Sequence, residues 1–404
     1  MARRTGWKLE VRIRTLNAGT WNLEPLGLYL HIPFCSAICN YCNFNRGLFD
    51  AGQKSRYVNA LLAEVEGAGR AGRAGRENAH AADTIYFGGG TPSLLEPADV
   101  ERIIGACRQA FDVTPDAEVT LEANPETVDQ RRLTAFREAG VTRVSYGVQS
   151  FLEPELRRLS RLHSAGRARQ ALAEARAAGF DNVSLDLMMW LPGQSVSQWL
   201  ESVDAAIAVS PDHISLYLLE VYPNAPLKDE MARAKWSQAP DEDAAAMYVT
   251  AMERLEAAGY EQYEISNVAR PGRRCRHNLK YWSDGDWMGF GCGAHGTVGG
   301  VRTKNVAATE DYIAGIGRGE PVTAEVRRLS AGERLGDALF MGLRLSDGID
   351  LEAISQRHGV DVWQKHGAEL EPFLAAGILR RQGARLALTR QGMLLANEVM
   401  TVFV

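Results

Sequence analysis

Three cysteines stand close together in the sequence, at Cys35, Cys39 and Cys42, directly after a short strand-like run. Thiolates are soft ligands, and three of them at this spacing can hold one soft metal centre. A cubane of four irons and four sulfides that only passes electrons has a thiolate on each iron, whereas this loop supplies three. The spacing therefore predicts a cluster with one open iron, which can take a small ligand as a catalytic cluster does.

Two other interpretations of these cysteines stay open at this point. His31 lies four residues before Cys35, so one imidazole and three thiolates could complete a tetrahedral zinc site. The cysteines could also be unligated core residues, although the loop around them is rich in small and polar residues.

Further polar residues follow the later strand-like runs. The segment 88–93 reads Gly-Gly-Gly-Thr-Pro-Ser, and its glycines allow a ligand to approach the backbone and allow the amides to form an anion-binding nest. Glu122, Gln149, Arg161 and Asp186 lie in or after the next strands, and each alone could be a surface or capping residue. Together they fall at or near the carboxyl ends of successive strands, where barrels of this type build their sites.

The segments that must position these residues alternate in a regular way. Between Gly27 and Leu219, short β-branched or aromatic runs are followed by longer segments with helical spacing of their apolar residues. The predicted strands are 27–32, 83–87, 118–122, 142–147, 182–188 and 213–219. Predicted helix faces carry Val100, Ile103, Ile104 and Cys107 in one case, and Trp199, Val203 and Ile207 in another. This alternation predicts parallel strands in an α/β barrel or an open doubly wound sheet, and composition does not choose between them.

A different pattern begins near Ala331. Leu335, Leu339 and Leu343 mark one helix, and 351–357 and 362–375 mark two more. Residues 378–388 form two short β-like runs separated by a glycine, before a last helix. Three helices and a hairpin predict a winged-helix-like module, with a scaffold or docking role because it has no concentrated basic face. The low-complexity segment 67–76 is predicted to be a solvated loop.

The overall composition excludes several classes of protein. The 404 residues carry 45 Lys and Arg against 50 Asp and Glu, a net charge of −5, so no basic field indicates nucleic-acid binding. No apolar run approaches the roughly 18 residues of a membrane span, and none follows Arg3 and Arg4 as in a signal peptide. Six cysteines are too few for a disulfide scaffold, and we expect a cytoplasmic protein.

The cysteine motif resembles the signature of the radical S-adenosylmethionine superfamily, with Tyr41 as the aromatic residue before the third cysteine. In that superfamily, the open iron of a [4Fe-4S] cluster binds the amino and carboxylate groups of S-adenosylmethionine, and an electron splits the cofactor into methionine and a 5′-deoxyadenosyl radical. The resemblance implies a partial (β/α)6 barrel. If the cofactor is cleaved, it also implies an electron donor of the flavodoxin or ferredoxin type.

Most of the chain resembles a narrower group, the oxygen-independent coproporphyrinogen III oxidases and the related HemW-type haem chaperones. The shared motifs are Tyr-Leu-His-Ile-Pro-Phe-Cys, Gly-Gly-Gly-Thr-Pro-Ser, Glu-Ala-Asn-Pro, Gly-Val-Gln-Ser-Phe and Leu-Pro-Gly-Gln. The resemblance implies an N-terminal extension at 1–26, the barrel and its extension at 27–305, and a smaller winged-helix-like α+β domain at 306–404. It also implies a cofactor site formed by Tyr29, Tyr41, Gly89, Gly90, Thr91, Glu122, Gln149, Arg161 and Asp186.

Three features favour the chaperone branch. Phe44 stands where the oxidases have a further cysteine, and only 34 residues precede Cys35, which leaves a shortened N-terminal arm. Residues 276–282 match the motif HNxxYW of the chaperones, which is associated with haem. Met189, Trp190 and Cys292 depart from the usual pattern on the substrate side.

The resemblance makes His277 the candidate axial ligand of haem iron, with Tyr281 and Trp282 as flat apolar neighbours. The alternative is that the two aromatics belong to the core and that His277 is a hydrogen-bonded buried residue. Secondary candidates are Cys275, Cys292 and His295, whereas Cys107 is expected in the core. The predicted function is transfer of haem to an acceptor protein. The alternatives are decarboxylation of porphyrinogen propionates and radical methyl transfer, and a homodimer is left open.

Overall fold

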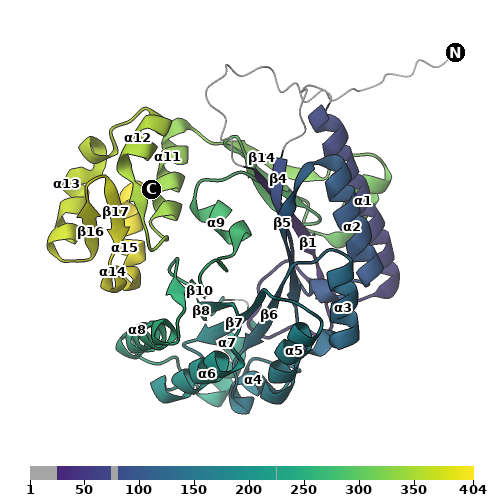
Figure 1. Ribbon diagram of the computed structural model, residues 1–404, viewed down its shortest axis with the longest axis horizontal. Helices are drawn as coiled ribbons and strands as arrows, with labels where there is room; N and C mark the ends of the chain where they lie inside the picture. The colour runs from purple at the N-terminus through teal and green to yellow at the C-terminus, as the bar shows by residue number, and fades with distance from the viewer. Residues whose placement is uncertain (1–24, 74–80, 224) are drawn as a thin grey trace.

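The strands that the sequence predicts form one side of a curved sheet with helices on its outer face (Figure 1). The computed structural model describes residues 25–73, 81–223 and 225–404. Six parallel strands are neighbours in chain order, namely β1 (Leu26–Ile32), β4 (Ala81–Gly89), β5 (Asp112–Ala123), β6 (Arg143–Gln149), β7 (Val183–Met189) and β8 (His213–Leu218). The predicted strands are confirmed in position and order, and the curved sheet decides for a partial barrel.

Helices connect these strands on the outside of the barrel. They are α1 (Ala51–Arg73), α2 (Pro97–Ala110), α3 (Gln130–Glu138), α4 (Glu153–Arg158), α5 (Ala165–Ala177) and α6 (Val196–Val209), with short 3₁₀ turns η1 (Pro92–Leu94) and η2 (Pro125–Thr127). The predicted helix faces are confirmed, because Ile103, Cys107 and Trp199 are fully buried. Burial also raises the pKa of Cys107 to about 12, as expected for a core thiol.

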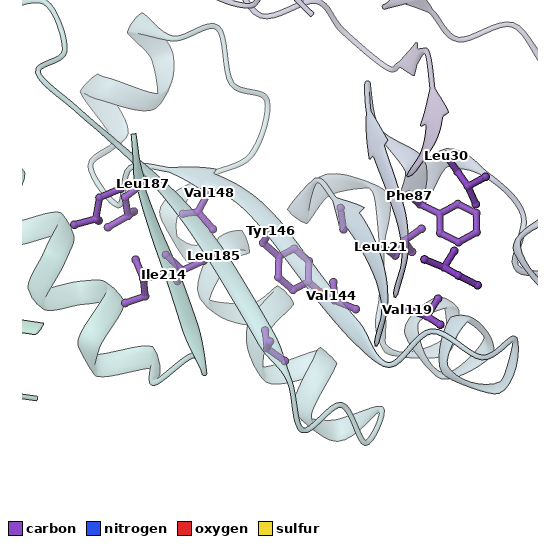
Figure 2. Packing of buried hydrophobic residues seen from close by; sticks show 14 of the residues in the cluster. Leu30, Phe87, Val119, Leu121, Val144, Tyr146, Val148, Leu185, Leu187 and Ile214 are labelled. Carbon is purple, nitrogen blue, oxygen red and sulfur yellow. The ribbon is translucent and has the colours of Figure 1, made fainter. Parts of the chain in front are cut away.

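The core lies between the outward face of the strands and these helices (Figure 2). Leu30, Phe87, Leu121, Val144 and Leu185 are all at 0% exposure and point to this layer. Successive side chains of a strand point to opposite faces, so the residues between them point into the barrel. Those inward residues are largely polar, which leaves the interior available for chemistry.

Further strands extend the sheet on both sides. β10 (Asn267–Ala269) and β9 (Glu261–Gln262) follow β8, whereas β11 (Trp287–Phe290), β12 (His295–Val298), β13 (Val301–Asn305) and β14 (Thr323–Arg328) continue from β1. The accompanying helices are α7 (Pro226–Ala234), α8 (Asp241–Ala257), α9 (Arg276–Trp282) and α10 (Thr309–Gly317). Because β14 pairs with β13, the twelve-stranded sheet extends across the boundary predicted at residue 305.

The C-terminal elements form the separate yellow group in Figure 1. They are α11 (Ala331–Gly342), β15 (Ile349–Asp350), α12 (Leu351–His358), α13 (Val362–Ala375), β16 (Leu379–Gln382), β17 (Arg385–Leu388), α14 (Arg390–Leu394), α15 (Ala396–Met400) and η3 (Thr401–Phe403). The three predicted helices and the hairpin are present. Gly377 and Gly383 take φ values of +70° and +60° at the end of α13 and at the hairpin turn. The sequence did not predict β15, a two-residue strand paired with β17.

Two predictions concern the edges of the described chain. The loop prediction for 67–76 is wrong as far as Arg73, because α1 continues to that residue. Ala and Arg favour helix, and a Cβ at Gly69 would lie 2.6 Å from Ala110, so this glycine permits the contact with the end of α2. Most of the predicted N-terminal extension lies outside the described residues. Within the described ranges, the helices are all too short or too polar to cross a bilayer.

Candidate functional site

The three cysteines lie on one loop at the carboxyl end of β1. Cys35 ends the two-residue strand β2 (Phe34–Cys35), which pairs with β3 (Gly47–Leu48). The amide of Phe49 donates to the carbonyl of Cys35 at 2.9 Å and closes the loop. Within it, the amide of Cys42 donates to the carbonyl of Cys39 at 3.3 Å. The loop therefore keeps the three thiols near one another above the barrel, each within electrostatic range of the other two.

Two donors from elsewhere in the barrel are aimed at these sulfurs. The Thr91 hydroxyl donates to Cys35 Sγ at 3.6 Å, and Arg161 Nη1 donates to Cys39 Sγ at 3.4 Å. Burial raises the pKa of the Cys35 and Cys42 thiols, so an adjacent cation or metal must favour their ionised form. Hydrogen bonds to the sulfurs are one of the means by which proteins set the reduction potential of iron–sulfur clusters. The residues present therefore fit a [4Fe-4S] cluster.

The position of His31 argues against the zinc alternative. Its Nδ1 hydrogen-bonds with the Tyr29 hydroxyl at 3.1 Å, and its Nε2 hydrogen-bonds with the carbonyl of Asn45 at 2.7 Å. Both nitrogens are thus occupied, so His31 is not a fourth ligand in this arrangement. Among the residues that the structure describes, no three His, Cys, Asp or Glu side chains are placed around a single ion.

The glycine segment serves close packing, not anion binding. A Cβ at Gly89, which has φ of +113°, would lie 2.5 Å from the His31 ring, and one at Gly90 would lie 2.7 Å from the carbonyl oxygen of Phe34. The amide of Gly89 donates to Glu122, and those of Gly90 and Thr91 donate to the carbonyls of Ile32 and Phe34. The predicted anion nest is therefore wrong for the amides of Gly89 and Gly90. The first is used by Glu122 on β5, and the second, with that of Thr91, holds the start of the cysteine loop against the end of β4.

Two carboxylates stand on the inner face near this segment. Glu122 accepts hydrogen bonds from the Tyr86 hydroxyl at 2.8 Å and from the amide of Gly89 at 3.1 Å, and burial raises its pKa to about 7. Burial also raises the pKa of Asp186 to about 6, although a hydrogen bond with Ser215 opposes the shift. Desolvated carboxylates gain most from a cationic partner, so the pair is suited to hold an ammonium or sulfonium group.

The remaining predicted cofactor residues surround the same region. Gln149 has φ of +71° and a buried Oε1 without a partner among the described residues, so this amide is directed at a missing donor. Tyr41 packs against a small apolar cluster that includes Leu159 and Met188, and it lies beside Arg161. The structure therefore brings Tyr41, Gln149 and Arg161 to the mouth of the barrel. Tyr29 lies on the inner face of β1, where its hydroxyl bonds His31.

Comparison with known proteins now decides the family. Residues 29–206 match the Radical SAM superfamily, and residues 329–395 match the HemN C-terminal domain. The chain is 39% identical over 381 residues to the heme chaperone HemW of Mycobacterium tuberculosis, covering 93% of this chain and 94% of that protein. It is 34% identical over 376 residues to HemW of Bacillus subtilis, covering 93% and 98%. The chain belongs to the HemW family.

The fold of this HemW-family chain is also seen in a solved structure. Coproporphyrinogen III oxidase (HemN) from Escherichia coli, described as a radical SAM enzyme, superposes with a TM-score of 0.83 at 22% identity. The match covers 95% of this chain and 91% of that one. At this identity the likeness concerns the fold, and it confirms the predicted barrel with a smaller C-terminal domain.

The predicted haem ligand of this HemW-family chain, His277, lies near Gly27 and Thr84, close to the amino ends of β1 and β4. His277 is 1% exposed, its Nδ1 hydrogen-bonds with the Thr84 hydroxyl at 2.8 Å, and its Nε2 hydrogen-bonds with the Tyr281 hydroxyl at 2.8 Å. Its ring stacks on Tyr86 with centroids 5.0 Å apart. Burial lowers the pKa of His277 to about 3, so the imidazole is neutral. A metal could therefore reach this histidine only by replacing one of the two hydroxyls.

The other haem candidates are dispersed. Trp282 lies under the Arg344 guanidinium at 4.3 Å from the ring centroid, and its Nε1 is buried without a partner among the described residues. Cys275 lies 3.5 Å from a Glu118 oxygen, and burial raises its pKa to about 12. Cys292 is buried at the end of β11, whereas His295 is exposed on β12. These four residues do not form one ligand set.

Sequence reasoning missed several inward residues, among them Tyr86, Thr120, Arg143 and Ser215. The signal that could have found them is the alternation of polar side chains along strands whose other positions are apolar, as in residues 213–217. The sequence analysis placed the site residues at the carboxyl ends of the strands, which form the mouth of the barrel, whereas these residues lie deeper inside it.

Proposed function

We propose that this chain binds haem and passes it to an acceptor protein, with a [4Fe-4S] cluster and S-adenosylmethionine held at the barrel mouth. The observation that carries the proposal is the match to proteins named heme chaperone HemW along 93% of the chain. The loop that carries Cys35, Cys39 and Cys42 supports the assignment of the cluster, because it offers three thiolates and leaves one iron open. Phe44, which is 65% exposed, supplies no thiol two positions after Cys42.

Cys35, Cys39 and Cys42 would hold the cluster, and Glu122 and Asp186 would hold the cofactor's cationic groups. When bound, the cluster supplies the electron that cleaves the sulfonium carbon–sulfur bond. Arg161 offsets negative charge at Cys39 through its 3.4 Å contact. Cleavage of the cofactor requires an external electron donor of the flavodoxin or ferredoxin type.

His277 is the proposed axial ligand, and its geometry sets the condition for ligation. The Tyr281 hydroxyl must leave Nε2, while Thr84 continues to bond Nδ1 and fixes the orientation of the ring. Tyr281 lies four residues after His277 in α9, so rotation of the Tyr281 side chain releases Nε2 without moving the helix away from Thr84. Haem binding is therefore expected to involve reorientation of the Tyr281 side chain.

The test is anaerobic reconstitution followed by optical titration with haem, in wild type, His277→Ala and Tyr281→Phe. Tyr281→Phe keeps the ring and removes the competing hydroxyl, so it should retain or strengthen binding, whereas His277→Ala should abolish the Soret shift. If both variants bind haem like wild type, His277 is not the ligand. If the wild type binds no haem, the chaperone function is wrong. Carbon dioxide release from coproporphyrinogen III in the same sample would favour the decarboxylase alternative.

A further inference from the structure

A charged side chain that the site does not use lies deep inside the barrel. Arg143 opens β6 and is 2% exposed, and its direct neighbour across β5 is Thr120, which is 0% exposed. The adjacent residues Leu121 and Val144 point outward to the helix layer (Figure 2). Arg143 and Thr120 therefore point side by side into the interior. Tyr86 is the next residue in the same row, paired with Thr120 across β4.

Both side chains have hydrogen-bonding capacity left over. Arg143 Nε and Thr120 Oγ1 are buried without a hydrogen-bond partner among the residues that the structure describes. In the same ranges, ion pairs within 4.0 Å involve many arginines, but Arg143 is not among them. Buried polar groups are nearly always paired, and two adjacent exceptions indicate a missing partner.

The acidic groups of the interior are already engaged. Glu118 accepts from the amides of Arg276 and His277 at 3.1 and 3.2 Å, and it also lies beside Cys275. Glu122 is held by Tyr86 and the amide of Gly89. The negative charges of Glu118, Glu122 and Asp186 still act on Arg143. What Arg143 Nε and Thr120 Oγ1 lack among the described residues is therefore a hydrogen-bond acceptor, not a compensating charge.

The chemistry of the pair selects the partner. A guanidinium offers parallel N–H groups that match the two oxygens of a carboxylate, and a hydroxyl beside it can donate a further hydrogen bond. A buried N–H or hydroxyl without a hydrogen-bond partner costs free energy, so a carboxylate that accepts from Arg143 Nε and Thr120 Oγ1 removes that cost. Tyr217, on the inner face of β8, is 42% exposed, so the inner face of the barrel meets solvent at the carboxyl end of this strand.

We propose that Arg143 and Thr120 form a carboxylate-binding subsite inside the barrel, and that a propionate side chain of haem occupies it. The subsite follows from the residues, whereas the choice of propionate rests on the proposed function. A small free carboxylate has the same chemistry. The subsite would hold the ligand by its acidic edge, independently of the iron and its axial ligand.

The experiment compares haem with haem dimethyl ester, whose propionates are neutral, on reconstituted wild type and Arg143→Gln. A charge-assisted hydrogen bond is worth about 1.5–3 kcal/mol, so wild type should bind the ester about ten- to a hundredfold more weakly. Arg143→Gln should bind haem more weakly by a similar factor and be indifferent to esterification. Arg102→Gln, on the exposed side of α2, is the matched control and should behave as wild type. Thermal melts establish that each variant is folded.

A second experiment tests the subsite with a variant of unchanged side-chain shape and with a ligand other than haem. Thr120→Val keeps the side-chain shape, and it should bind haem and free propionate more weakly than wild type, the latter measured by calorimetry. If wild type binds propionate and Thr120→Val does not, the subsite for a free carboxylate is supported, even in the absence of haem binding. Absence of haem binding by wild type would instead contradict the chaperone function. Equal affinity of wild type for haem and its ester, with no heat from propionate, would overturn the subsite.

Discussion

Replacing Glu122 with glutamine should make the protein more stable and its cofactor site weaker. The pKa of Glu122 is about 7 because burial disfavours the ionised form, compared with 4.5 for an ordinary glutamate. Folding therefore favours the protonated acid, and this contribution is complete below pH 4.5 and is lost as the pH rises through 7. The difference corresponds to up to about 3 kcal/mol of unfolding free energy above neutral pH. Glu122→Gln imitates the protonated acid and should avoid that loss.

Urea unfolding at pH 5 and pH 8 measures this directly. Glu122→Gln should equal wild type at pH 5 and exceed it by about 2–3 kcal/mol at pH 8, while the control Glu138→Gln, on the exposed side of α3, should change neither value. Binding of S-adenosylmethionine to wild type should be roughly tenfold weaker at pH 6 than at pH 8, because only about a tenth of Glu122 is then ionised. The variant should bind weakly at both. A variant less stable than wild type at pH 8, or one that keeps the pH dependence of binding, would refute the reasoning.

Three further outcomes are expected. Cys39→Ala should lower bound iron and sulfide after reconstitution, whereas Cys107→Ala should leave both unchanged; full iron content in the first variant would contradict the cluster loop. Gly89→Ala should reduce the affinity for S-adenosylmethionine at least tenfold, because its Cβ would meet His31 at 2.5 Å, and wild-type affinity in calorimetry would show that the contact relaxes freely. Arg161→Gln should shift the cluster midpoint potential to more negative values in a redox titration followed by electron paramagnetic resonance, because a positive hydrogen-bond donor to Cys39 is lost; an unchanged potential would remove that role.

The local features of this protein could be predicted from its sequence. The alternation of strands and helices in the barrel follows from periodicity, which is a property of neighbouring residues. It placed the strands within a few residues, except that β5 begins at Asp112, well before the predicted start at residue 118. The cysteine loop was equally accessible, because its three thiols are close in the chain. The extent of α1 was not, since the packing of Gly69 on Ala110 decides that a glycine-rich segment stays helical.

Contacts between distant segments were decided only by the tertiary structure. His277 was predicted to be either a haem ligand or a hydrogen-bonded buried residue. Only the packing of α9 against β4 shows that both its nitrogens are occupied, by Thr84 and Tyr281. The glycines of the motif at 88–93 indicate that another segment packs closely on this backbone, but not which segment. The structure shows that it is the end of β1 and the start of the cysteine loop, at His31 and Phe34. The sequence of its strand does not distinguish Arg143 from other strand residues. Only the packing of the neighbouring strands shows that its Nε is buried without a hydrogen-bond partner among the described residues. Sequence spacing determines what lies along a strand, whereas the register between strands and the burial of its inner face determine what each side chain can bind.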